Sequence, residues 1–191
     1  VGPDGWHAVS LEPPAFLEPL DLTVPGDFSS AAFFLALAAL APAGRVRMRA
    51  VGVNPTRTGL LSVLERMGAV VTFSDSCDIC GEPVADIDAG PASLTATTVH
   101  GSEIPAMIDE VPVLAVLAAR AHGETRITGA AELRVKESDR LAALAINLRA
   151  VGVEAEELPD GLVVRGTEAP LAGHVRAFHD HRIAMAFGDA V

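Results

Sequence analysis

Two apolar runs without a polar face are the feature that most restricts how this chain can fold. The first, Ala31 to Ala41, consists of strong helix formers and follows the potential capping residues Asp27 and Ser29. The second is Val111 to Ala121, where Pro112 is tolerated because it lies in the first helical turn. A helix that is hydrophobic all round belongs inside a core. We therefore predict a domain that surrounds these helices on several sides.

Strand patterns accompany each buried helix. From Arg45 to Val51, arginines alternate with apolar residues, which is typical of a strand with one solvent-exposed face. Further strands are predicted at 20–24, 69–73, 84–88, 94–99, 125–128, 153–156, 161–165 and 174–177, and surface helices at 60–67 and 138–150.

The elements recur in the same order after about eighty residues. Gly68 corresponds to Gly152, each closing a surface helix before a strand. A third copy begins with the strand at 174–177 and an apolar helix from Asp180 to Phe187. We predict an α/β fold of repeats, each built as strand, buried helix, strand, surface helix and strand pair.

Residues 1–20 have a different character. Trp6, Val9 and Leu11 predict a strand, and the proline-rich stretch from Glu12 to Pro19 that follows is our candidate domain boundary.

The composition limits the kinds of partner. The net charge of −11 argues against a broad nucleic-acid or anionic-membrane surface, so a local cluster of cations must hold any anionic ligand. No apolar run reaches the roughly 18 to 20 residues of a spanning helix, and no signal-peptide pattern opens the chain. The cytoplasm is the expected location.

Cys77 and Cys80 have a spacing that could suit a metal or a redox pair. Since no second pair exists to complete a zinc site, we interpret them as loop thiols.

Leu133 to Arg140 is the densest group of charges in the chain. If this stretch opens a helix, Lys136 and Arg140 lie on one face with Glu137 beside them. Such a group could bind a phosphorylated or carboxylated ligand and hold a proton-transfer residue against it. From this stretch alone, however, a solvated, salt-bridged first turn is the favoured interpretation.

Other polar residues also gather at helix starts, where free N–H groups favour anions. Asp180 can be read as an ordinary helix cap. Arg182, however, is a cation at a helix start, as Arg140 is, and the helix dipole disfavours it there. A cation is disfavoured at a helix N-terminus, and this chain places one there at two corresponding positions. Such a departure from a local rule indicates a functional site. The candidates are Ser29 and Ser30, Asp109 and Glu110, Lys136 to Arg140, and His179 to Arg182.

Five ordered motifs resemble the successive blocks of the enolpyruvylshikimate phosphate synthase family, and they cover nearly the whole chain. The second and third look most like the branch known for glyphosate-tolerant bacterial members. The five are Pro25-Gly-Asp-Phe-Ser-Ser30, Asn54-Pro-Thr-Arg-Thr-Gly59, Met107-Ile-Asp-Glu110, Leu133-Arg-Val-Lys-Glu-Ser-Asp-Arg140 and Asp180-His-Arg-Ile-Ala-Met185.

The resemblance implies two globular domains of three repeats each, an inside-out α/β barrel with helices buried, sheets outside and the active site between the domains. Residues 1–20 would be the end of the first domain and the crossover, and residues 21–191 an incomplete second domain. The chain begins at Val1 without an initiator methionine, so we expect a piece of a longer protein. Its main partner would be the missing N-terminal domain of the same protein.

The reaction implied is transfer of the enolpyruvyl group from phosphoenolpyruvate to shikimate 3-phosphate with release of phosphate, in aromatic amino acid biosynthesis. It needs no metal and no cofactor. By the resemblance, Asp109 is the base at the shikimate hydroxyl, and Glu137 is the acid and base near the methylene carbon. Lys136 touches both substrates.

The remaining roles implied are in binding. Arg140 and Arg182 hold the phosphate and carboxylate of phosphoenolpyruvate, with His181 as a polar neighbour. Many members have an asparagine that touches shikimate 3-phosphate where this chain has Glu132, so that contact is not carried over.

Two alternatives remain open. A related enolpyruvyl transferase of cell-wall synthesis acts on a UDP-sugar, although the Lys136 to Arg140 and Asp180 to Arg182 blocks favour the shikimate enzyme. The chain taken alone could also be a catalytically inert folding module, and we expect no turnover from it in isolation.

Overall fold

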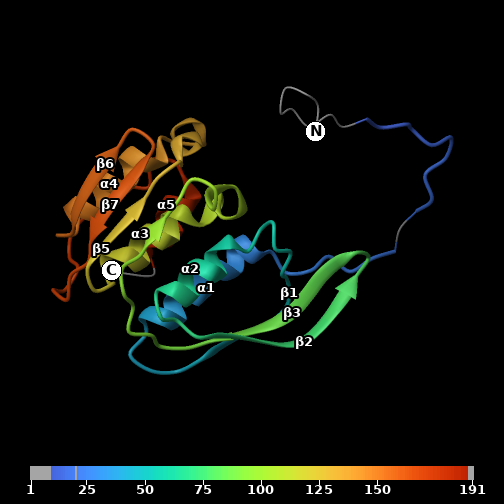
Figure 1. Ribbon diagram of the computed structural model, residues 1–191, viewed down its shortest axis with the longest axis horizontal. Helices are drawn as coiled ribbons and strands as arrows, with labels where there is room; N and C mark the ends of the chain where they lie inside the picture. Colours follow the sequence, from blue (N-terminus) through green and yellow to red (C-terminus); the bar gives the residue numbers. More distant parts are fainter. Residues whose placement is uncertain (1–9, 20, 189–191) are drawn as a thin grey trace.

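The computed structural model describes residues 10–19 and 21–188. Within them, two β-sheets lie on opposite sides of the molecule, and helices α1 and α3 lie between the sheets (Figure 1). This is the predicted arrangement of buried helices and outer sheets.

Helix α1 (Phe28–Leu40) begins where the sequence predicts. Asp27 is its N-cap, and its carboxylate accepts a hydrogen bond from the backbone N–H of Ser30 at 2.7 Å. Most of the helix is buried, but Phe34 and Leu37 form an exposed apolar stripe on one side. The prediction of burial on every side is therefore correct for most of this helix and wrong for that stripe.

The first repeat forms a three-stranded antiparallel sheet in the order β1-β3-β2. The register of β1 against β3 shifts near Ala50, whose φ of 51° marks a bulge. The elements of this repeat are β1 (Val46–Gly52), α2 (Gly59–Arg66), β2 (Val71–Ile79) and β3 (Glu82–Ala89).

The second repeat forms a four-stranded sheet in the order β4-β5-β7-β6. Strands β5, β7 and β6 repeat the order of β1, β3 and β2, which confirms the internal repeat. Its elements are β4 (Thr98–Val99), η1 (Ile104–Ala106), η2 (Ile108–Glu110), α3 (Val111–Ala119), β5 (Glu124–Ile127), η3 (Ala131–Val135), α4 (Arg140–Ala150), β6 (Glu154–Leu158) and β7 (Gly161–Arg165).

Helix α3 is the centre of the core. All nine of its residues are buried, and it packs against α1, α4, β7 and α5 (His181–Gly188). With no polar face, it is stable only because apolar neighbours surround it.

Two predicted strands are absent from the described residues, and a third is shorter than predicted. Residues 21–24 pair with no other strand of the described chain. Leu20 and the strand predicted around Trp6 and Val9 lie outside the described residues. Residues 174–177 do not form a strand either, and the backbone of Arg176 is hydrogen-bonded to a side chain instead of to a neighbouring strand. Asn147 donates to the carbonyl of Arg176 at 2.9 Å and accepts from its N–H at 3.0 Å. The strand predicted at 94–99 shrinks to β4 and a single bridge at Thr95.

The cysteines are placed differently from the prediction. Cys77 lies within strand β2, and only Cys80 lies in the turn before β3. Both are exposed free thiols. Within the described part of the chain, no helix is long and apolar enough to cross a membrane.

Candidate active site

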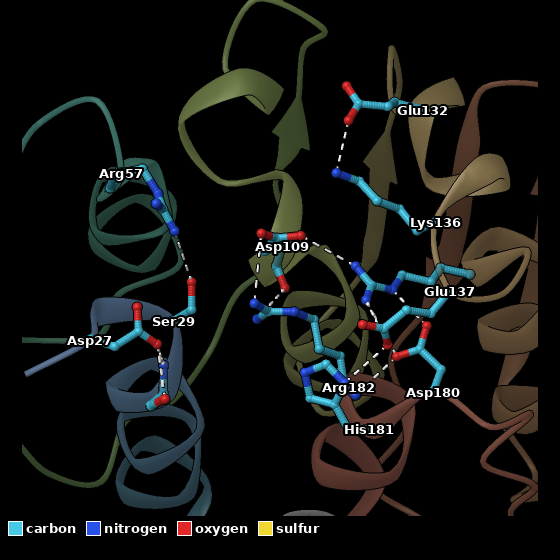
Figure 2. Close-up of polar contacts among 12 residues, drawn as sticks. Asp27, Ser29, Arg57, Asp109, Glu132, Lys136, Glu137, Asp180, His181 and Arg182 are labelled. Carbon is cyan, nitrogen blue, oxygen red and sulfur yellow. Dashed lines mark hydrogen bonds and ion pairs between the residues drawn. The ribbon is translucent and has the colours of Figure 1, made fainter.

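Three helix starts lie close together, and each carries a polar residue singled out in the sequence (Figure 2). Helix α1 contributes Ser29, η2 contributes Asp109 immediately before α3, and α5 contributes Arg182. Because the peptide N–H groups at a helix start carry partial positive charge, three starts on one side form a region that favours anions.

Arg140 and Asp180 form the buried centre of the site. Their side chains are 3% and 0% exposed, and Arg140 Nε lies 2.8 Å from Asp180 Oδ2. Asp180 also accepts hydrogen bonds from the Ser138 hydroxyl and from the backbone N–H of Arg182, both at 3.0 Å. The last of these caps α5, so reading Asp180 as a helix cap is correct but incomplete.

Asp109 joins the two arginines. Its carboxylate lies 3.2 Å from Arg140 Nη1 and 3.6 Å from Arg182 Nη2. Arg182 Nη1 also donates to the Asp109 carbonyl at 3.4 Å. Sequence reasoning expected an anion to offset these misplaced cations, and in this structure the protein's own carboxylates do so.

Glu137 lies at the edge of this cluster. Its Oε2 is 3.6 Å from Arg140 Nη2 and 3.0 Å from Nδ1 of His181. Both Glu137 and His181 are about half exposed, which leaves them open to a ligand. The structure thus brings together five of the six predicted site residues: Asp109, Glu137, Arg140, His181 and Arg182.

Lys136 is the sixth, and it is placed differently. Lys136 and Arg140 would share one helical face if Leu133 to Arg140 opened a helix, but α4 begins only at Arg140, with Asp139 as its N-cap. Lys136 follows the 3₁₀ helix η3 in an extended conformation, and its Nζ pairs with Glu132 at 2.8 Å. The shared face required a helix that already includes Lys136, and that condition is not met, because α4 begins four residues after Lys136.

The pKa values of two buried carboxyl groups, those of Asp180 and Glu110, shift in opposite directions. Burial alone would raise the pKa of Asp180, but hydrogen bonds from Arg140, Ser138 and the Arg182 amide, with the Arg140 charge, lower it below its ordinary value. Burial raises the pKa of Glu110, and Asp109 adds to the increase. The Ser29 hydroxyl and the charges of Arg182 and Arg57 oppose it.

A metal ion does not suit this cluster. Glu137, Asp180 and His181 each offer a ligand atom, and these atoms lie within 4.8 Å of one another. Two of the three are carboxylates that Arg140 already contacts, at 2.8 Å and 3.6 Å. A divalent cation would have to sit beside a buried guanidinium, which is electrostatically unfavourable.

Sequence reasoning gave no role to Arg57. It lies in the turn between β1 and α2, and its Nη2 donates to the Ser29 hydroxyl at 3.4 Å (Figure 2). The signal was available, because Arg57 stands inside the second ordered motif, but no local pattern indicates that this turn reaches the start of α1.

Comparison with known proteins identifies the family of this chain. The sequence profile of EPSP synthase (3-phosphoshikimate 1-carboxyvinyltransferase) matches residues 3–188. The chain belongs to the EPSP synthase family. This confirms the family resemblance inferred from the five ordered motifs.

Curated relatives in the EPSP synthase family are closely similar in sequence. A 3-phosphoshikimate 1-carboxyvinyltransferase of Thermus thermophilus is 56% identical over 170 residues, which cover 89% of this chain and 40% of the relative. That of Acaryochloris marina is 48% identical over 190 residues, covering 100% of this chain and 42% of the relative. The chain therefore spans about 40% of the length of the relatives it matches.

Solved structures confirm the fold. A 2.37 Å structure of EPSP synthase from Acinetobacter baumannii aligns with a TM-score of 0.84 and 42% identity, covering 88% of this chain and 40% of that one. The enolpyruvyl transferase NikO from Streptomyces tendae aligns with a TM-score of 0.62 at 21% identity, which supports the fold alone. The predicted enolpyruvyl transferase-like α/β fold is confirmed.

Proposed function

We propose that the complete protein containing this chain transfers the enolpyruvyl group of phosphoenolpyruvate to shikimate 3-phosphate and releases phosphate. Membership of the EPSP synthase family and the names of its relatives support this proposal. A cytoplasmic location is part of it, since both substrates are phosphorylated small molecules.

One observation carries the proposal: two guanidinium groups, from Arg140 and Arg182, meet the carboxylate of Asp109 at the starts of α3, α4 and α5. Planar guanidinium groups bind carboxylate and phosphate groups through paired N–H donors. Phosphoenolpyruvate carries both of these anionic groups. A neighbouring carboxylate is the group needed to accept a proton from an attacking hydroxyl.

The proposed chemistry has three proton transfers at carbon and at the attacking hydroxyl. Asp109 takes the proton of the shikimate hydroxyl as its oxygen bonds to the second carbon of phosphoenolpyruvate, and Glu137 protonates the methylene carbon, giving a tetrahedral adduct. Glu137 then removes a proton from the new methyl group while the bond from carbon to the phosphate oxygen breaks. The phosphate leaves with the electron pair of that bond, and Asp109 gives up the proton it received to the released phosphate. The His181 contact orients the Glu137 carboxylate.

Lys136 completes the proposed set. It lies immediately before Glu137 on the same exposed segment, and its ammonium group is only lightly committed, to the side chain of Glu132. A surface ion pair of this kind is weak, about 0–1 kcal/mol, so an anionic substrate can displace it. We propose that Lys136 contacts both substrates once Glu132 is displaced.

The domain assignment is also a proposal. Residues 1–20 would end a first globular domain and cross over, and residues 21–191 would be an incomplete second domain. Coverage of only 40% of the relatives supports a partner domain elsewhere in the same protein. We propose that this N-terminal domain supplies the rest of the substrate contacts.

The test is phosphate release by the full-length protein with phosphoenolpyruvate and shikimate 3-phosphate. Lys136→Met or Arg182→Ala should lower turnover at least about 10²-fold without unfolding the protein. Arg165→Ala, which removes a cation from the exposed face of β7, is the matched control and should keep normal turnover.

Two further arms make the assay decisive. Turnover with a UDP-sugar acceptor in place of shikimate 3-phosphate would assign the protein to the cell-wall branch instead. Near-normal turnover of both site variants would overturn the residue assignment. The isolated 191-residue chain should show no turnover, and activity from it would refute the need for a partner domain.

A further inference from the structure

Arg134 is a charged residue to which the reaction proposed above gives no role. All three of its guanidinium nitrogens donate hydrogen bonds. Nε donates to the carbonyl of Pro159 at 2.8 Å, and Nη2 donates to that of Leu158 at 2.6 Å. Nη1 lies 2.8 Å from Glu157 Oε1 and 2.9 Å from Asp139 Oδ2. Arginine is the side chain that offers such donors in one rigid plane, so it can reach four acceptors at once.

The segment that follows, residues 136–139, has little backbone support, although it carries Lys136 and Glu137. It lies between η3 and α4 and belongs to neither. Within the described part of the chain, none of its backbone amides donates to a backbone carbonyl. Side chains must therefore hold it in place. The ion pair between Arg134 and Asp139 joins the two ends of the segment at 2.9 Å, as a brace does.

The brace is anchored to the turn between β6 and β7. Asp160 in that turn accepts a hydrogen bond from the backbone N–H of Gly129 through its carboxylate, at 2.8 Å. Its carbonyl accepts from the N–H of Ala130 at 2.7 Å. Gly161 packs so tightly that a Cβ there would overlap the backbone carbonyl of Ile127. The turn is therefore a rigid support for the guanidinium group and for the loop before it.

Glu137 connects the braced segment to the site (Figure 2). Its Oε2 lies 3.0 Å from His181 Nδ1 and 3.6 Å from Arg140 Nη2. Arg140 is fixed independently, by its buried pair with Asp180 at 2.8 Å. Ser138 also holds the far end of the segment to Asp180, at 3.0 Å. Loss of the brace at the near end would thus move Glu137 relative to groups that stay in place.

We propose that Arg134 is a positioning residue: by bracing residues 136–139 against the β6–β7 turn, it sets the position of the Glu137 carboxylate at the site. This role rests on the proposed function, in which Glu137 moves the proton at the methylene carbon. Arg134 touches no substrate and acts through Glu137. A displacement of about 1 Å at a reacting group can cost on the order of 10²-fold in rate, so turnover should be sensitive to the brace.

The kinetic experiment compares four forms of the full-length protein: wild type, Arg134→Ala, Glu137→Gln and the double variant. Arg134→Ala should lower kcat at least about tenfold. It should change the KM for phosphoenolpyruvate less than about threefold, because Arg140 and Arg182 keep their own carboxylate partners. In the Glu137→Gln background, removing Arg134 should lower kcat no further, since the group that it positions is already absent.

Arg149→Ala is the matched control. Arg149 lies at the opposite end of α4 from Arg140 and donates to the carbonyl of Ala155 in β6 at 2.7 Å, so it also joins this part of the chain to the second sheet. Its loss should lower stability without lowering the kcat of the folded protein. Arg134→Lys is the milder variant, because an ammonium group keeps the charge but cannot reach the four acceptors together. It should give an intermediate kcat, and it carries the same test if Arg134→Ala does not fold.

The NMR signal of the His181 ring is a readout that a purely structural role would not move. Its Nδ1 lies 3.0 Å from Glu137 Oε2, so its chemical shift reports the position of that carboxylate. In protein labelled with ¹³C-histidine, the signal is assigned by its loss in His181→Gln. Arg134→Ala should shift it in the same direction as Glu137→Gln does, and Arg149→Ala should leave it unchanged.

An unshifted His181 signal in Arg134→Ala, a kcat within about twofold of wild type, or an equal fall in kcat in both backgrounds overturns this inference and leaves the proposed reaction intact. If the wild type shows no turnover, the proposed function fails instead. The His181 signal then decides the inference alone, because it needs no turnover. A shift in Arg134→Ala supports the positioning of Glu137, and the absence of a shift refutes it.

Discussion

Replacing Asp180 by alanine tests whether the buried ion pair holds the third repeat against the second. The substitution leaves Arg140, with a side chain only 3% exposed, without its partner at 2.8 Å. It also removes the acceptor for the Ser138 hydroxyl and for the amide that begins α5. Three stabilising interactions are lost at one position.

The expected loss of free energy of unfolding is large because the ion pair is buried. Removing one partner of a buried ion pair costs about 3–5 kcal/mol, because an uncompensated charge remains in a low-dielectric site. Arg140 keeps its contacts with Asp109 at 3.2 Å and Glu137 at 3.6 Å, which reduces that penalty. The two lost hydrogen bonds each add about 1 kcal/mol. We expect the free energy of unfolding to fall by about 3–5 kcal/mol.

Urea unfolding of the full-length protein, followed by circular dichroism, measures this change. With m-values of about 1–3 kcal/mol/M, the midpoint should fall by about 1 M or more. Glu154→Ala is the control, because its pair with Arg165 is exposed and should be worth less than about 1 kcal/mol. A loss below about 1 kcal/mol in Asp180→Ala would show that Asp109 and Glu137 suffice to neutralise Arg140, and the reasoning would be refuted.

Four other outcomes are expected from the same unfolding assay. Since the pKa of Asp180 is lowered from 3.8, the stabilisation it gives over Asp180→Asn should be complete above that pH and disappear as the pH falls through the folded-state pKa. Glu110→Gln should raise the free energy of unfolding at neutral pH. Because the pKa of Glu110 is raised from 4.5, the folded protein favours the protonated carboxyl group. The stabilisation from this group is complete below pH 4.5 and is lost as the pH rises through the folded-state pKa, so the neutral glutamine is better tolerated at neutral pH. Gly161→Ala should destabilise by more than about 2 kcal/mol, because a Cβ there would overlap the backbone carbonyl of Ile127; a neutral result would show that the β6–β7 turn can move. Leu144→Ala, in the fully buried face of α4, should cost about 2–5 kcal/mol, and a smaller loss would mean that the core collapses into the cavity.

Much of the fold could be predicted because its signals are local. The Asp27 cap and the unbroken apolar run after it fix the start and the burial of α1. The repeat of that pattern at α3 identifies the internal duplication. The reasons why two predicted strands do not form are not found in their local sequence. Residues 21–24 have no pairing partner in the described chain, and the backbone of Arg176, within 174–177, is hydrogen-bonded to Asn147. A side chain that substitutes for a neighbouring strand leaves no mark in a hydrophobic pattern.

The residues of the candidate site could be singled out from the sequence, but the contacts between them could not. Misplaced cations at two helix starts identified Arg140 and Arg182. The pairing of Arg140 with Asp180 spans 40 positions of sequence, and no local rule joins them. The placement of Lys136 failed because a 3₁₀ turn and an extended residue replace the expected helical turn. Glu110 was noted only as a helix-start charge, since burial cannot be read from its position.

The complete burial of α3 has a consequence for local opening of the structure. Its backbone amides are covered by α1, α4, α5 and β7, so they should exchange with solvent only when the whole core opens. Helix α1 has an exposed stripe at Phe34 and Leu37, so we expect its amides to be less protected from exchange than those of α3. Asp109 stands at the beginning of α3 and is therefore anchored to the segment that opens least. Thermal fluctuations that loosen the outer sheets should leave the proposed base in place.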